Sequence, residues 1–179
     1  MDLTNLLGAL TSNEAASTIA KNLNLNSNQV SSVITAALPS LLGAMQQNAS
    51  SQAGAASLAD ALGYHAGNAG NIVNNLKAAD LVDGNKILSH IFGGNLSKVL
   101  NGISKSTGVN ATSVSSILAS IAPSLLALLG KGQQSSGTNA AGLESMLGVI
   151  LGGLSSGGSS NAGGLGSILG GLGSILGKK

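Results

Sequence analysis

Apolar residues recur at the spacing of an α-helix through most of residues 1–132. One apolar stripe along a predicted helix consists of Val30, Val33, Ile34, Ala37 and Leu41. These residues have the spacing i, i+3, i+4, i+7 and i+11, which places them on one face of a helix. Sustained alternation of β-branched and polar residues, which is typical of a half-buried strand, occurs nowhere in the chain. The pattern therefore predicts an all-α protein.

A second copy of this stripe lies 84 positions further along the chain, counted from Lys21 to Lys105. Residues 21–45, KNLNLNSNQVSSVITAALPSLLGAM, align with residues 105–129, KSTGVNATSVSSILASIAPSLLALL. The alignment also places the chain's two prolines at equivalent positions. A match of this length indicates an internal duplication.

Each copy is predicted to be a helical hairpin, so that the core consists of two helix-turn-helix-like halves. In the first copy, Thr11-Ser-Asn-Glu14 has the spacing of a capping box, which predicts a helix that starts near Ser12 or Asn13. Asn26 is predicted to cap the long helix that follows. In the second copy, residues 95–105 supply the short helix.

The two prolines, Pro39 and Pro123, lie inside the predicted long helices. A proline has no backbone N–H and its ring clashes with the preceding turn, so it kinks a helix or splits it. Because the apolar spacing continues through both prolines, we expect kinked helices rather than breaks after Leu38 and Ala122.

Three shorter helices are predicted between the two copies, at residues 54–63, 71–79 and 84–94. Asp83 precedes the last of these and is predicted to be its N-cap, because a carboxylate there accepts a hydrogen bond from an otherwise unpaired N–H. The core is thus a multihelical unit that joins two duplicated hairpins.

The composition changes after residue 132. Residues 133–142 are rich in Gln, Ser, Gly and Asn, which predicts a flexible linker. Residues 143–179 combine Leu and Ile with many glycines and are predicted to form a Gly/Leu-rich amphipathic C-terminal extension. The sequence therefore predicts a duplicated α-helical core over residues 1–132, followed by the linker and the extension.

The extension ends in a repeated heptad, GGLGSIL, at residues 163–169 and again at 170–176. On a helical wheel all the apolar residues of this region fall in one arc, which favours a helix over a strand. We call this set the C-terminal stripe; it consists of Leu165, Ile168, Leu169, Leu172, Ile175 and Leu176.

The C-terminal stripe is predicted to become helical only when another surface covers it. Each glycine costs a helix about 1 kcal/mol relative to alanine, whereas burial of each Leu or Ile gains about 1.5–3 kcal/mol. Four covering surfaces stay open at this point: the chain's own core, a second copy, a membrane surface and an unlike protein.

The low charge of the chain favours self-association. Charged residues make up 8% of the sequence, against about a quarter in typical proteins, and the formal net charge is +2. Eight basic residues and two aromatic ones provide little to bind phosphates or stack on bases, so nucleic acid is an unlikely partner despite the helix-turn-helix-like halves.

Candidate catalytic and metal-binding chemistry is sparse. His90 follows Asp80 and Asp83, but zinc needs three or four clustered ligands, and the chain has only two histidines and no cysteine. We therefore predict no catalytic residues, no metal and no cofactor, and a protein that is not an enzyme.

Targeting signals are also lacking in the sequence. The N-terminus has no basic region followed by an apolar one, and no run reaches the roughly 18–20 apolar residues of a transmembrane helix. The most apolar run, residues 117–130, is predicted to be a buried core helix. The expected location is cytoplasmic by default, with non-classical export left open.

Three segments resemble a bacterial domain-of-unknown-function family, number nine-three-seven, which includes YidB-like proteins. They are GAASLADAL at residues 54–62, DGNKILSHIFGG at 83–94 and SVSSILASIAPSLLALLGK at 113–131. The resemblance implies a multihelical fold with two helix-turn-helix-like halves, and it supplies no catalytic residues.

These observations predict a non-enzymatic, self-associating structural protein. It is expected to form a homo-oligomer or filament through apolar helical faces and the C-terminal stripe. The alternative is a membrane-surface or membrane-active protein that uses the same stripe, followed by Lys178 and Lys179, on anionic lipid. A weak DNA-binding protein is the third hypothesis.

Overall fold

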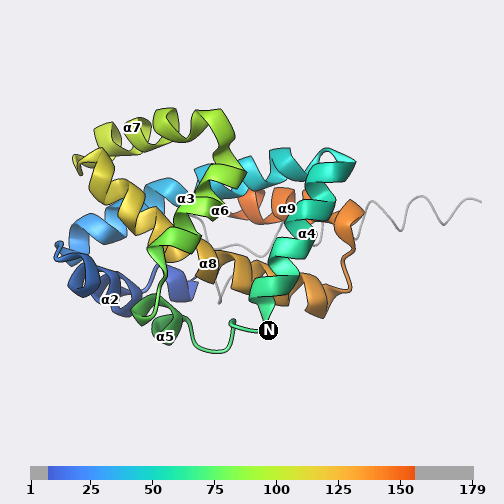
Figure 1. Ribbon diagram of the computed structural model, residues 1–179, viewed down its shortest axis with the longest axis horizontal. Helices are drawn as coiled ribbons and strands as arrows, with labels where there is room; N and C mark the ends of the chain where they lie inside the picture. Colours follow the sequence, from blue (N-terminus) through green and yellow to red (C-terminus); the bar gives the residue numbers. More distant parts are fainter. Residues whose placement is uncertain (1–7, 156–179) are drawn as a thin grey trace, which may run out of the picture.

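The computed structural model describes residues 8–155, which contain eight α-helices and two short 3-10 helices (Figure 1). No strand occurs in this part of the chain, and the prediction of an all-α fold is confirmed. In chain order the elements are α2 (Asn13–Leu23), α3 (Ser27–Ala49), α4 (Gln52–Ala66), α5 (Ile72–Lys77), α6 (Leu81–Phe92), η1 (Gly93–Asn95), α7 (Leu96–Thr107), α8 (Ala111–Ser136), η2 (Ala140–Gly142) and α9 (Leu143–Ser155).

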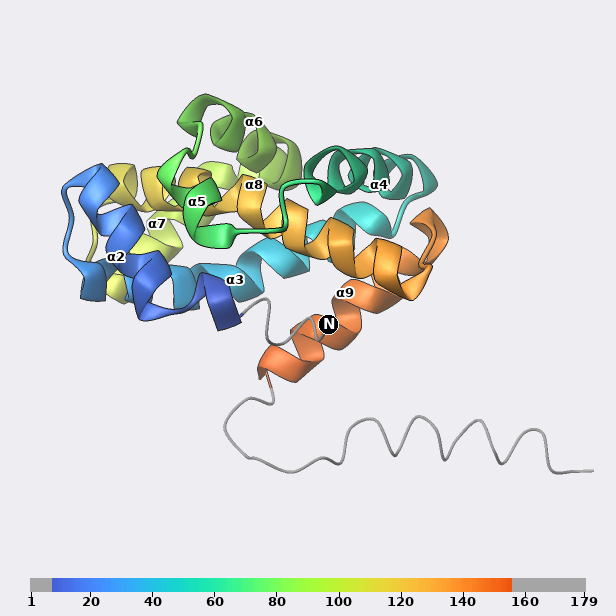
Figure 2. The same ribbon diagram turned by 90° about the horizontal axis from the view of Figure 1, so that it is seen from below.

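The two long helices, α3 and α8, form the centre of the molecule. Helices α4 and α6 pack on α8, whereas α9 packs on α3 and lies on the side of the core away from α6 (Figure 2). The short helices α2 and α7 each contact both α3 and α8. Each long helix is therefore packed against several others.

Helix α8 is the most deeply buried element. It is the one described helix long and apolar enough to cross a membrane by length and composition, and 78% of its most apolar window is buried inside the protein. Ile117, Leu118, Ile121 and Leu125 have no exposed surface. The prediction that residues 117–130 form a buried core helix is confirmed.

Side-chain caps begin the helices where local sequence predicts them. The Ser12 hydroxyl accepts a hydrogen bond from the Ala15 N–H at 3.2 Å, and Asn26 accepts one from the Asn28 N–H at 2.8 Å. Each bond satisfies an N–H that has no partner within its helix. The predicted starts of α2 and α3 are confirmed.

The predicted N-cap of α6 is wrong. The capping residue is Asp80, whose carboxylate accepts hydrogen bonds from the N–H groups of Val82 and Asp83 at 2.8 and 3.3 Å. Asp83 instead lies in the first turn, where its charge is favoured by the helix dipole. The helix begins earlier than predicted because Leu81 packs against the core and extends the apolar face of α6.

Both long helices continue through their prolines, as expected, and do not break after Leu38 and Ala122. Pro123 has no N–H, and the Ala119 carbonyl therefore lacks its usual helical donor four residues on. Gly84 of α6 lies directly against that carbonyl: a Cβ atom on Gly84 would stand 1.9 Å from the Ala119 oxygen. The glycine thus allows α6 to approach the backbone of α8 closely.

The end of α8 also differs from the prediction. Residues 133–136, which we assigned to a flexible linker, continue the helix, and Gly137 ends it with a φ of +65°. Glycine favours a helix end, but Gly130 and Gly132 are buried within α8, and Gly130 packs against the Leu62 carbonyl of α4.

The next helix, α9, also belongs to the core. Its Leu143 and Leu147 have no exposed surface, and the helix packs on α3. One side of α9 is thus covered by the chain's own helices through Leu143 and Leu147. The C-terminal stripe, residues 165–176, lies outside the residues that the structure describes.

Candidate interaction surfaces

The residues considered for metal or acid–base chemistry do not form a cluster. Within residues 8–155 no group of three or more His, Cys, Asp or Glu side chains could hold a metal ion. His90 is exposed on the outer side of α6. Asp83 instead faces His65 of α4, with 3.9 Å between the His65 Nε2 and Asp83 Oδ2 atoms.

The pair between His65 and Asp83 was missed by sequence reasoning because it joins two separate helices. His65 is 7% exposed and sits at the end of α4, while Asp83 lies in the first turn of α6. When His65 is protonated the pair is an ion pair that ties α4 to α6.

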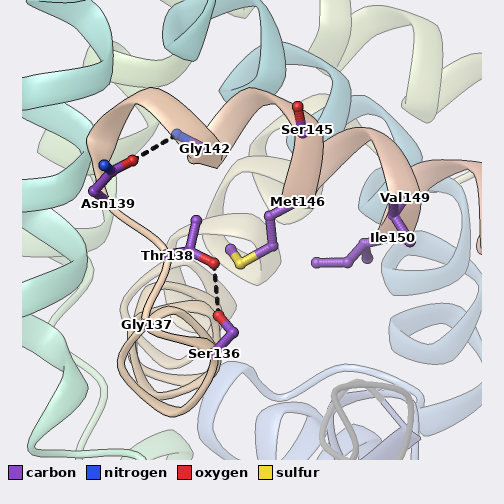
Figure 3. Close-up of a pocket in the computed structure, with 9 residues that line it drawn as sticks. All are labelled: Ser136, Gly137, Thr138, Asn139, Gly142, Ser145, Met146, Val149 and Ile150. Atoms are coloured by element: carbon purple, nitrogen blue, oxygen red, sulfur yellow. Dashed lines mark hydrogen bonds between the residues drawn. The ribbon is translucent and has the colours of Figure 1, made fainter. Parts of the chain in front are cut away.

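An apolar groove lies at the corner between α8 and α9 (Figure 3). It has a volume of about 590 Å³, and its α9 wall carries Met146, Val149 and Ile150. The Met146 side chain extends toward Ser136 and Thr138 at the end of α8 (Figure 3). The remaining lining residues are Gly137, Asn139, Gly142 and Ser145.

Several polar groups of this groove are already paired with one another. The Asn139 Oδ1 atom accepts a hydrogen bond from the Gly142 N–H at 3.1 Å, and the Ser136 and Thr138 hydroxyls lie 2.7 Å apart. No charged side chain lines the groove, and Val149 is 59% exposed. The groove therefore suits an apolar side chain better than a charged ligand.

A shallow depression on the outer side of α6 is more polar. It is lined by Val82, Asn85, Lys86, Ser89 and His90. Val82 is 65% exposed, and the other side chains present one lysine cation and hydrogen-bonding groups to the solvent. All five residues come from one helix, so the depression has no opposing wall.

The third surface is one side of α3, which we call the open face of α3. It consists of four small residues at helical spacing, of which Ser32, Thr35 and Pro39 are exposed and Ala36 is half-buried. The face of α8 that contains its own proline is covered: Ala119 is fully buried and Gly84 of α6 lies against it. This difference between the faces of α3 and α8 could not be predicted from the sequence, because it depends on where α6 packs.

Comparison with known proteins identifies one family. The family model described as "Bacterial protein of unknown function (DUF937)" matches residues 5–132, which cover α2 to α7 and most of α8. Among curated proteins and solved structures, none matches the chain.

Proposed function

This chain belongs to the bacterial family of unknown function DUF937, and on that premise we propose that it is a non-enzymatic structural protein that associates with copies of itself. In this proposal the C-terminal stripe of one copy packs on the helical core of another. The observation that carries it is an asymmetry of the core: α6 covers α8, whereas the open face of α3 has no such cover among the described helices.

The asymmetry matters because we propose that the core is a duplication of helical hairpins. Helix α2 (Asn13–Leu23) and helix α7 (Leu96–Thr107) are the short helices, and each precedes a long helix that contains a proline. The long helices have equivalent caps, since Asn26 accepts from the Asn28 N–H and Asn110 from the Ser113 N–H. These bounds and caps agree with the 84-residue offset that runs from Lys21 to Lys105.

The third helices of the two halves support the same proposal. Leu58 and Leu62 of α4 are buried, and so are Leu143 and Leu147 of α9, which have the same spacing. Helix α4 packs on α8, the long helix of the second half, and α9 packs on α3, the long helix of the first half. The third helix of each half thus packs on the long helix of the other half.

Individual contacts follow this exchange. Gly130 of α8 faces the Leu62 carbonyl of α4. The residue 84 positions before Gly130 is Gln46 of α3. Gln46 faces Gly148 of α9, and its Nε2 atom lies 2.9 Å from the place that a Cβ atom on Gly148 would occupy. This contact, one residue from Leu147, supports a repeat that extends past residue 132, where the family match ends.

The open face of α3 is available to another molecule. Its equivalent on α8 buries Ala119 beneath α6, and it is composed of similarly small residues. The surface around it has few charges to keep copies apart, because only 8% of the sequence is charged. Burial of six Leu or Ile side chains would supply about 9–18 kcal/mol before the entropy of ordering is subtracted.

Sedimentation velocity of the full-length chain tests the proposal. We expect the wild type to sediment above its 17.3 kDa chain mass and the variant Leu169→Asp/Leu172→Asp to sediment as a monomer. Two carboxylates on the stripe cannot be buried without a large desolvation cost. The matched control, Gly170→Asp/Ser174→Asp, adds the same charge outside the apolar arc and should still associate. A monomeric wild type, or an equally disrupted control, would contradict the proposal.

Membrane binding is the alternative, favoured by Lys178 and Lys179 directly after the stripe. Vesicles made of equal parts phosphatidylcholine and phosphatidylglycerol separate the two functions. A wild type that stays monomeric in solution but co-sediments with these vesicles, and loses this in the Leu169→Asp/Leu172→Asp variant, would establish the membrane function instead.

A further inference from the structure

We infer that residues 165–176 of one copy dock on the open face of α3 of a second copy, in the position that α6 holds on α8. This inference rests on the proposed self-association and names the surface that receives the C-terminal stripe. It follows from three features: the register of the stripe relative to α6, the order of helices along the chain, and the contacts that hold α6 in place.

The register of the stripe matches the buried side of α6 at the offset of the repeat. Helix α6 packs through Leu88, Ile91 and Phe92, which are buried, and through Leu81, which is half-buried. The residues 84 positions later are all members of the C-terminal stripe: Leu165, Leu172, Ile175 and Leu176. A helix over residues 165–176 would therefore have apolar side chains at the positions where α6 has the side chains that pack on the core.

The order of elements along the chain agrees with this register. Helix α4 packs on α8, and the chain then leads to α6, which packs on the same long helix. Helix α9 packs on α3, and the chain then leads to the C-terminal stripe. Helix α6 packs on the same long helix as the α4 that precedes it. By the same rule, a segment that follows α9 and resembles α6 would pack on α3, the long helix that α9 contacts.

The contact between α4 and α6 has an uncharged counterpart. His65 of α4 faces Asp83 of α6. The equivalent of His65 is Ile150 of α9, if Leu62 is aligned with Leu147, an offset one residue longer than 84. The equivalent of Asp83 is Ser167, at the offset of 84. A pair that can carry charge in one half thus corresponds to an isoleucine and a serine in the other, so this contact brings no charge against the apolar stripe.

One difference sets the distance between the stripe and α3. Gly84 brings α6 against the Ala119 carbonyl, whereas the equivalent residues are Ile168 of the stripe and Thr35 of α3. Ile168 has a bulky side chain and Thr35 is exposed, so the stripe would rest on α3 through side chains rather than through backbone contact. The open face of α3 consists of small residues, which leaves room for these side chains.

Disulfide trapping tests the docked position directly, because the chain has no cysteine of its own. The chain carrying Thr35→Cys is mixed with a size-tagged chain carrying Ile168→Cys and oxidised, so that a cross-link of mixed size joins two molecules. We expect this mixture to give severalfold more mixed cross-link than a control mixture of Val149→Cys with Ile168→Cys. Val149 is exposed in the corner groove, which makes it the matched alternative.

A charge on the acceptor surface gives a second, independent readout. Thr35→Arg places a long cation on the open face of α3, and we expect it to abolish association as fully as Leu169→Asp/Leu172→Asp does. Thr112→Arg, at an exposed threonine of α8, is the control and should associate like the wild type.

The outcomes separate this inference from the proposed function. If the stripe variant becomes monomeric while Thr35→Arg still associates and Thr35→Cys traps no partner, the docking position is wrong and self-association stands. Preferred trapping at Val149→Cys would place the stripe in the corner groove and would likewise overturn the inference. If the wild type is monomeric, both proposals fail.

Discussion

Gly84 shows how a single residue sets the distance between two helices. A Cβ atom there would lie 1.9 Å from the Ala119 carbonyl oxygen, and backbone cannot move aside as a flexible side chain can. From the sequence alone, Gly84 is simply a glycine inside the predicted helix over residues 84–94. Its role depends on Pro123 and α8, which a local pattern cannot connect to it.

We expect Gly84→Ala to lower the free energy of unfolding by about 2–3 kcal/mol, because the added methyl group pushes α6 away from α8. Urea denaturation of the full chain measures this loss. The control is Gly102→Ala in α7, where a Cβ atom would meet nothing within 4 Å. That change should instead stabilise the helix by about 0.5–1 kcal/mol. Equal effects of the two substitutions would contradict the close contact.

At the scale of the element, the starts of α2 and α3 could be predicted to within about one residue from local rules. The capping-box spacing that begins at Thr11 predicts a start near Ser12 or Asn13, and Ser12 is the N-cap, while Asn26 caps α3 as predicted. The start of α6 could not be predicted, because Asp80 and Asp83 both satisfy the rule and the packing of Leu81 decides between them. The end of α8 was missed for a similar reason: Gly130 packs against α4 instead of ending the helix.

Substitution of the two aspartates tests the corrected cap of α6. Asp80→Ala removes two hydrogen bonds to the first turn and should lower the free energy of unfolding by about 0.5–2 kcal/mol. Asp80→Asn keeps an acceptor oxygen and should restore most of the loss. Asp83→Ala should cost less than about 1 kcal/mol, because its contact with His65 is long and Asp83 is 42% exposed. A larger loss for Asp83→Ala than for Asp80→Ala would contradict this assignment.

At the scale of the whole molecule, the sequence predicted the helical class, but not which helices pack on which. Helix α4 packs on α8, α9 packs on α3, and His65 reaches Asp83, through contacts that no periodicity encodes. The candidate surfaces share this limit. The C-terminal stripe could be found from its spacing, whereas the open face of α3 is recognised only by comparison with the covered face of α8.

In the proposed assembly, the C-terminal stripe and the open face of α3 are two complementary surfaces of one chain. A contact between different surfaces of successive copies is heterologous, and it extends into a filament or closes into a ring. A copy without a working stripe or without a working open face can therefore take part in one contact but cannot continue the chain of contacts.

Sedimentation equilibrium of two complementary variants is the most direct test of this account. Thr35→Arg keeps the C-terminal stripe and loses the open face of α3, whereas Leu169→Asp/Leu172→Asp does the reverse. We predict that each variant alone is a monomer of about the 17.3 kDa chain mass, and that an equimolar mixture forms a dimer of twice that mass and nothing larger. A mixture that remains monomeric at concentrations where the wild type associates would contradict the docking of one copy's stripe on another copy's α3.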